Sequence, residues 1–304
     1  MISTASFIAM PERALLIVAG KDAAHFLHNL LTASIESLKP GEGSPAALLT
    51  PQGKVISEML VFNAADQGDT EGLFVIDIAY GYAGDLLVRL TQYKLRADVT
   101  IGLAPAGTSV AVLLDFPNFA SDDIYVFADP RHAGLGHRLY GPKDLLKTFE
   151  TRFTLETQDN YHRRRVELGI PEIGKDFASL EVFPHDILLD QLGAVDFKKG
   201  CYVGQEVVSR MEHRGTARTR ALPVRYEGGF GVLGGAAVRV GERQIGAVGE
   251  SFGDRGIAIL RLDKLSDAFQ AGEAVTAGGV PVRFEKPDFV RFSMPTAQST
   301  ALPS

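Results

Sequence analysis

The sequence has one cysteine, no tryptophan and no apolar run near the roughly 20 residues that a membrane-spanning helix needs. The single cysteine, Cys201, cannot form a disulfide within the chain and cannot alone supply a four-cysteine zinc or iron–sulfur site. The motifs of phosphate-binding loops, dinucleotide-binding folds, zinc proteases and serine hydrolases are also missing. These absences argue against disulfide-stabilised proteins, membrane-spanning proteins and the enzymes that carry those motifs.

Positive charge is in the minority as well. The 304 residues include 31 basic and 37 acidic side chains, which gives a net charge of −6. Proteins that bind duplex DNA usually present a basic face, so this balance argues against that partner. The N-terminus lacks the segments of a signal peptide, and a lone cysteine suits a reducing compartment. We therefore expect a cytoplasmic protein, or a mitochondrial matrix protein if the source is eukaryotic, that is neither secreted nor bound to membranes.

The distribution of glycine divides the chain. Residues 1–220 contain 19 glycines, whereas the much shorter stretch 221–290 contains 13. Such a density is typical of short strands joined by tight turns, so we predict a small β-barrel over residues 221–290. The segment 291–304 is small, polar and proline-bearing, and we expect it to be disordered.

The longer first region alternates strand and helix patterns. Residues 14–18 form an apolar strand pattern, and apolar residues follow Asp22 at helical spacing. Pro51-Gln52-Gly53, between two apolar runs, predicts a hairpin. This order predicts an α+β fold with helices on one face of an antiparallel sheet, in two packed subdomains over residues 1–105 and 106–220.

The most unusual segment surrounds the cysteine. It reads Lys199-Gly200-Cys201-Tyr202-Val203-Gly204-Gln205-Glu206. Four arginines follow and form a predicted basic patch: Arg210, Arg214, Arg218 and Arg220. Nearby cations stabilise a thiolate, which makes the sulfur a better nucleophile or metal ligand. The alternative is a buried structural cysteine, because free cysteine is among the most buried residue types.

This segment resembles the signature of the YgfZ family, folate-binding-type proteins related to the T-protein of glycine cleavage and to a mitochondrial iron–sulfur assembly factor. Leu48–Lys54 looks like the family's hairpin, Tyr93–Val99 is similar to its helix-to-strand passage, and Arg165–Gly169 resembles a pattern shared with T-protein. The resemblance covers most of the chain. It implies a T-protein-like region of two subdomains, a C-terminal β-barrel, and tetrahydrofolate or a one-carbon derivative in a central cavity between them.

The resemblance also implies roles for single residues. The glutamate of the family's Arg-x-Glu pattern contacts the pterin; here it is Glu167, with Arg165 two residues before it. A carboxylate can accept two parallel hydrogen bonds from the aminopyrimidine edge of a pterin. Tyr161 would offer a stacking face, and the basic patch would meet the glutamate tail of folate. The alternative for Glu167 is an exposed carboxylate paired with Arg163 or Arg164.

One position departs from the T-protein pattern. T-proteins carry a paired Asp-Asp in the second hairpin strand, where an aspartate serves aminomethyl transfer, whereas this chain has Ser57-Glu58. The longer side chain moves the carboxylate by roughly one C–C bond, and a misplacement of about 1 Å can cost on the order of a hundredfold in rate. Glu58 is therefore a catalytic candidate only if the chain is a transferase.

The sequence thus predicts a tetrahydrofolate-binding factor that supports assembly or repair of iron–sulfur proteins and, through them, tRNA modification. Cys201 would act as a thiolate, either as nucleophile or as a shared metal ligand, with Lys199 keeping it ionised. We expect no metal held by this chain alone, so a partner protein, a second copy or glutathione would supply further ligands.

Two alternatives remain open. The first is a folate-dependent aminomethyl transferase or demethylase with Glu58 as base. The second is an RNA-binding accessory of tRNA modification that uses the basic patch.

Overall fold

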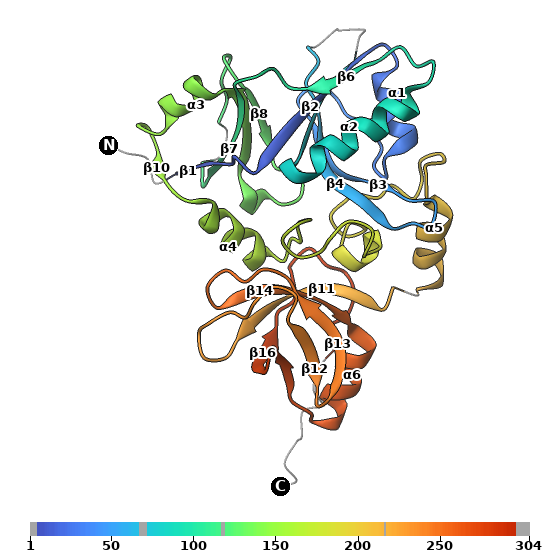
Figure 1. Ribbon diagram of the computed structural model, residues 1–304, viewed down its shortest axis with the longest axis vertical. Coiled ribbons are helices and arrows are strands. Elements are labelled where there is room, and N and C mark those ends of the chain that lie inside the picture. The colour runs from blue at the N-terminus through green and yellow to red at the C-terminus, as the bar shows by residue number, and fades with distance from the viewer. Residues whose placement is uncertain (1–4, 67–71, 117–118, 216, 296–304) are drawn as a thin grey trace.

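Two five-stranded sheets lie side by side above a closed six-stranded barrel in the part of the chain that the computed structural model describes (Figure 1). That part comprises residues 5–66, 72–116, 119–215 and 217–295. The predicted α+β fold with a C-terminal barrel is confirmed. No helix in these ranges has the length and apolar character needed to cross a bilayer.

The first sheet is antiparallel throughout, and two helices pack against it. Leu27 of the first helix and Leu86 and Leu90 of the second are buried against the apolar side chains of the sheet. In spatial order the strands are β3 (Gly43–Leu49), β4 (Val55–Asn63), β5 (Gly72–Ala79), β2 (Arg13–Gly20) and β6 (Thr100–Leu103), and the helices are α1 (Ala23–Leu30) and α2 (Tyr80–Lys94).

The second sheet combines the start of the chain with residues 108–155. β1 pairs with β7 on one side and with β10 on the other, although it comes from the predicted first subdomain. A strand this short carries no local signal for its partners. In spatial order the strands are β10 (Thr154–Leu155), β1 (Ser6–Ala9), β7 (Thr108–Leu114), β9 (His137–Pro142) and β8 (Tyr125–Ala128); α3 (Lys143–Phe149) follows β9.

The barrel closes because β11 pairs with both β14 and β16. Gly246 allows a close approach inside it, since a Cβ atom there would lie 2.3 Å from the Ile259 carbonyl oxygen. Phe292 and Met294 pack against the barrel, and residues 296–304 of the predicted disordered tail lie outside the described residues. The elements are β11 (Thr219–Tyr226), β12 (Ala237–Val240), β13 (Arg243–Val248), β14 (Arg255–Arg261), α6 (Leu262–Ala271), β15 (Val275–Ala277) and β16 (Val280–Phe284).

The segment between α4 (Gln158–Leu168) and α5 (Gln205–Arg214) lies between the sheets and the barrel (Figure 1). Tyr161 and Val166 of α4 belong to one apolar core with Val112 of the second sheet and Ile257 of the barrel. The three parts therefore meet around α4 and the loops that follow it, which include the short helix η2 (Pro184–Ile187).

Packing of α2 on the first sheet is directly testable. Leu90→Ala should lower the free energy of unfolding by about 3 kcal/mol, because it leaves a cavity in the core. The control Val88→Ala, on the same helix at a position that is 54% exposed, should change it by less than about 0.5 kcal/mol. Urea unfolding measures both variants, and equal effects would contradict the described packing.

Candidate functional site

A network of buried charges joins the two sheets. Arg13 of β2 donates from Nε to Asp77 Oδ1 at 2.6 Å, and Asp77 lies on β5 of the same sheet. From the other sheet, Arg138 Nη1 donates to Asp77 Oδ2 at 3.2 Å, and the Tyr140 hydroxyl donates to the same oxygen at 2.9 Å. Arg138 Nε also donates to Asp129 Oδ2 at 3.1 Å. All of these side chains are buried, so each depends on its partners for the hydrogen bonds that water would otherwise supply.

Tyr161 extends this network from α4. Its hydroxyl accepts hydrogen bonds from Arg131 at 2.7 Å and from Arg138. The Arg138 guanidinium lies 5.1 Å from the centroid of the ring, and the His162 ring packs against it in an edge-on arrangement. Tyr161 is completely buried, so the predicted stacking face is not open to a ligand.

Glu172 lies in the same interior among three guanidinium groups, those of Arg13, Arg131 and Arg165. Burial alone would raise its pKa, but the guanidinium groups of Arg13 and Arg165 hold the pKa at about 2. The nearest nitrogens of Arg13, Arg131 and Arg165 lie 3.7, 3.9 and 3.9 Å from its oxygens, and among the described residues Oε2 has no hydrogen bond. Two further buried atoms, Arg165 Nη2 and Asp176 Oδ1, also form no hydrogen bond among the described residues. Buried polar atoms are normally hydrogen-bonded, so Oε2 of Glu172 keeps an unused capacity to accept a hydrogen bond.

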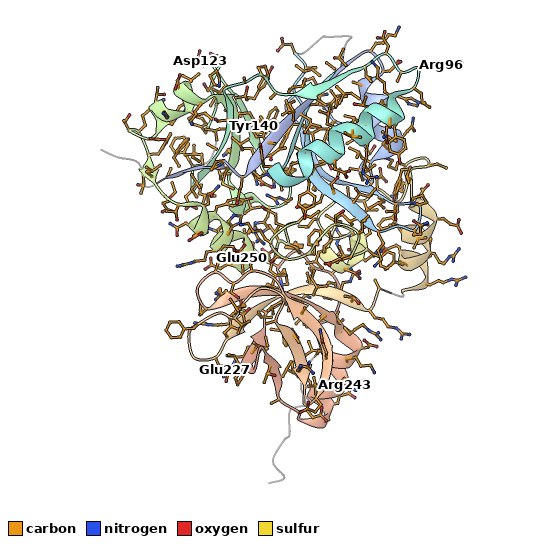
Figure 2. The ribbon with its side chains drawn as sticks, viewed as in Figure 1. Arg96, Asp123, Tyr140, Glu227, Arg243 and Glu250 are labelled. Atoms are coloured by element: carbon orange, nitrogen blue, oxygen red, sulfur yellow. The ribbon has the colours of Figure 1, made fainter. Side chains whose placement is uncertain are left out.

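A cleft of about 320 Å³ opens beside Glu172. Lys175, which lines this cleft, forms ion pairs on both sides. Its ammonium group lies 3.4 Å from Glu12 and 3.2 Å from Glu250, which follows β13 of the barrel (Figure 2). We call this space the central cleft. Its lining comes from the β1–β2 turn, the start of α2 and the loop after α4: Pro11, Glu12, Ala79, Tyr80, Gly81, Tyr82, Glu172, Ile173, Gly174 and Lys175.

Arg165 and Glu167 point in opposite directions, because two residues of helix correspond to a rotation of about 200°. Arg165 is buried and donates from Nη1 to Asp176 Oδ2 at 2.5 Å. Glu167 is exposed and lines a separate open cavity with Arg163 and Arg164. Glu167 therefore does not reach the central cleft. The carboxylates that line it are Glu12 and Glu172, and the sequence predicted neither of them.

Glu58 lies behind the lining of the central cleft. It is buried on β4, and its Oε1 accepts a hydrogen bond from the backbone N–H of Ile173 at 3.2 Å. Burial raises the pKa of Glu58, and the nearby charge of Arg131 opposes this shift only in part. A carboxyl group with a raised pKa next to a cleft is a candidate for proton transfer.

Lys199 anchors the cysteine loop beneath the end of α1. Its ammonium group donates to the carbonyl oxygens of Leu31 at 2.6 Å, Ala33 at 2.7 Å and His28. Burial lowers the pKa of Lys199 to about 8, so the ammonium form prevails at neutral pH. All three of its protons are used by the backbone. These contacts make Lys199 a loop anchor, and its predicted role as the counterion of a Cys201 thiolate stays a prediction.

The two motifs of the resemblance come together next to this anchor. Gly204 has φ +84°, and a Cβ atom there would lie 2.5 Å from the carbonyl oxygen of Thr50 in the predicted hairpin. Only glycine permits this approach. Gln205 and Glu206 begin α5 directly afterwards, and Tyr202 is buried.

Cys201 itself is exposed, so the alternative of a buried structural cysteine is wrong. Two groups of side chains with ligand-type atoms close together occur among the described residues: Glu12, His162 and Glu172, and His185, Asp190 and Glu212. Cys201 belongs to neither group. A metal or cluster bound by its sulfur would need ligands from outside the described part of this chain.

The predicted basic patch is smaller than expected. Arg220 is buried, and its Nη1 donates to Asp190 Oδ1 at 2.6 Å and to the carbonyl oxygen of His185 at 2.8 Å. Arg210 forms an ion pair with Glu206 at 2.5 Å. Arg214 and Arg218 are exposed.

Comparisons with known proteins agree with this architecture. A family model described as the CAF17 C-terminal beta-barrel domain matches residues 218–292. The chain is 30% identical to the mitochondrial iron–sulfur cluster assembly factor IBA57 homolog of Pyricularia oryzae, over 90% of this chain and 76% of that protein. It is 29% identical to the IBA57 protein of Homo sapiens, over 88% of this chain and 82% of that protein.

The fold is also similar to the crystal structure of the glycine cleavage system aminomethyltransferase T from Bartonella henselae. The TM-score is 0.76 at 14% identity, and the match covers 95% of this chain and 87% of that one. This likeness concerns the fold alone. The extent and identity of the sequence matches show the family: the chain belongs to the IBA57 family of iron–sulfur cluster assembly factors.

Proposed function

We propose that this chain supports iron–sulfur cluster assembly by binding tetrahydrofolate in the central cleft and by presenting Cys201 as a thiolate to a partner protein. Family membership supports the assembly role. The observation that carries the folate proposal is Glu172, a buried and ionised carboxylate beside the cleft whose Oε2 accepts no hydrogen bond from the described residues.

The residues present fit a folate. The aminopyrimidine edge of a pterin offers two parallel N–H donors, which match an ionised carboxylate such as Glu172. Tyr80 and Tyr82 supply aromatic surface for the ring system. The cleft volume of about 320 Å³ lies within the range of small-molecule sites. A bound tetrahydrofolate would supply nitrogen atoms able to carry a one-carbon group.

Cys201 suits exchange with a partner. The Lys199 contacts and the close approach at Gly204 fix both sides of its loop, while the thiol remains exposed. One thiolate is a single ligand, and the common iron–sulfur clusters have four protein ligands. Iron–sulfur assembly proteins, a second copy or glutathione would supply the others.

Glu172→Gln should weaken tetrahydrofolate binding by about tenfold or more, because it removes a charge-assisted hydrogen bond. Anaerobic calorimetric titration measures the affinity, and circular dichroism confirms folding. Tyr80→Ala, at a 71% exposed position, tests the same cleft without disturbing the buried charges and should also weaken binding. Glu167→Gln is the control on α4 and should bind like the wild type. Loss of binding only in the Glu167 variant would overturn the assignment of the cleft.

Cys201→Ala should keep the unfolding temperature of the wild type and abolish complementation of a strain that lacks its own family member. Lys199→Met should instead lower the stability by about 1–3 kcal/mol, because it leaves backbone carbonyls without a buried partner. Thermal unfolding separates the two effects. Full complementation by Cys201→Ala would refute the role of the thiol.

Glu58 supports a second candidate, a folate-dependent aminomethyl transferase or demethylase. The supporting observations are that burial raises the pKa of Glu58 and that its carboxyl group accepts a hydrogen bond from Ile173, which lines the cleft. Transfer of a one-carbon unit from an aminomethyl donor to tetrahydrofolate should then be measurable, and Glu58→Gln should reduce its rate by about a hundredfold or more. Absence of transfer by the folate-bound wild type would remove this candidate. RNA binding has less support, since Arg220 is buried and Arg210 is paired.

A further inference from the structure

A second cavity, of about 490 Å³, lies next to the central cleft. Pro11 and Tyr80 line both spaces. Arg13 lines the second cavity, and its Nη1 lies 3.7 Å from Glu172 of the central cleft. The two cavities are therefore neighbours, separated by only a few side chains. We call the second one the α3 cavity, because α3 forms its outer wall.

The α3 cavity differs from the central cleft in charge. Lys143 and Lys147 line it, one helical turn apart on α3, and both are exposed. Neither lysine forms an ion pair within the described residues, and Glu150 is the single acidic residue in the lining. The central cleft, by contrast, has two carboxylates, Glu12 and Glu172, and one ammonium group, that of Lys175. One end of the combined space thus favours donor groups and the other favours anions.

The α3 cavity also has an apolar lining. Phe7, Met10 and Leu146 contribute to it, and all three are buried. Tyr80 stands at the junction of the two cavities. Such a surface suits an aromatic ring or a chain of methylene groups between two polar ends.

We infer that the two cavities form one binding site, in which Lys143 and Lys147 select folates that carry a chain of several γ-linked glutamates. This inference rests on the proposed folate function. A folate has a donor-bearing pterin at one end, a benzoyl ring in the middle and carboxylates at the other end, which is the order of chemistry along this site. Each added glutamate contributes one more carboxylate along the tail, so a longer chain offers the two lysines more anionic partners.

The basic patch expected from the sequence does not take this role. α3 and α5 lie on opposite sides of the molecule (Figure 1). Of the four arginines, Arg220 is buried against Asp190. A tail that leaves the central cleft past Tyr80 meets the lysines of α3, and its carboxylates form ion pairs that depend on salt.

The test compares anaerobic binding of tetrahydrofolate with one and with five glutamates to the full chain. The pentaglutamate should bind about tenfold more tightly at low salt, and the advantage should shrink as salt rises. Lys143→Gln combined with Lys147→Gln should reduce the ratio of the two affinities to about one. Arg210→Gln combined with Arg214→Gln is the matched control, which removes two cations from α5 and should leave the ratio unchanged.

The outcomes separate the two proposals. If the wild type binds neither folate, the proposed function fails. If it binds both folates equally, the folate site stands and the selection by α3 is refuted. If the ratio falls in the arginine variant and not in the lysine variant, the tail lies along α5 and the inference is wrong.

Discussion

The contact between Arg138 and Asp77 is the constraint on which the rest of the structure depends. It joins the two sheets through charges that water cannot reach. A buried ion is tolerated only where its partners are fixed, and removing one partner leaves an uncompensated charge. Arg13, Asp129, Tyr140 and Tyr161 complete the set, so the sheets and α4 hold one relative position. The network reaches the central cleft through Arg13, whose Nη1 lies 3.7 Å from Glu172 in the lining.

The cysteine loop combines fixed backbone contacts with an exposed thiol. The Lys199 ammonium group joins the loop to the end of α1, and the backbone of the loop packs closely against the hairpin at Gly204. Both contacts involve backbone atoms of distant segments, so the position of Cys201 follows from the first sheet. An exposed thiol on a fixed loop can be recognised by a partner without a large loss of conformational entropy.

Sequence reasoning located the fold, the barrel and the cysteine loop, because these leave local or compositional signals. It did not find the contacts that depend on distant partners. Lys199 was assigned to its neighbour in sequence, although its acceptors lie more than 160 residues away. Glu167 was predicted to contact the pterin because it matches a motif. Since Arg165 faces the interior of the protein, the helical rotation turns Glu167, two residues later, toward solvent. Asp77, which interrupts the apolar run Leu73–Ile78, carried a usable signal, since an acid inside a buried strand requires a partner.

The position of β1 has a consequence for how the chain folds. β1 lies between β7 and β10, so the second sheet contains a strand from the very start of the chain and another from beyond residue 150. During synthesis β1 is made before both of its partners. Roughly a hundred further residues must be added before β7 is available for pairing, and more before β10 is. Contacts between such distant segments slow folding and leave strand edges exposed meanwhile. A chain shortened at its N-terminus would lose a strand from the interior of the second sheet and would therefore be prone to aggregation.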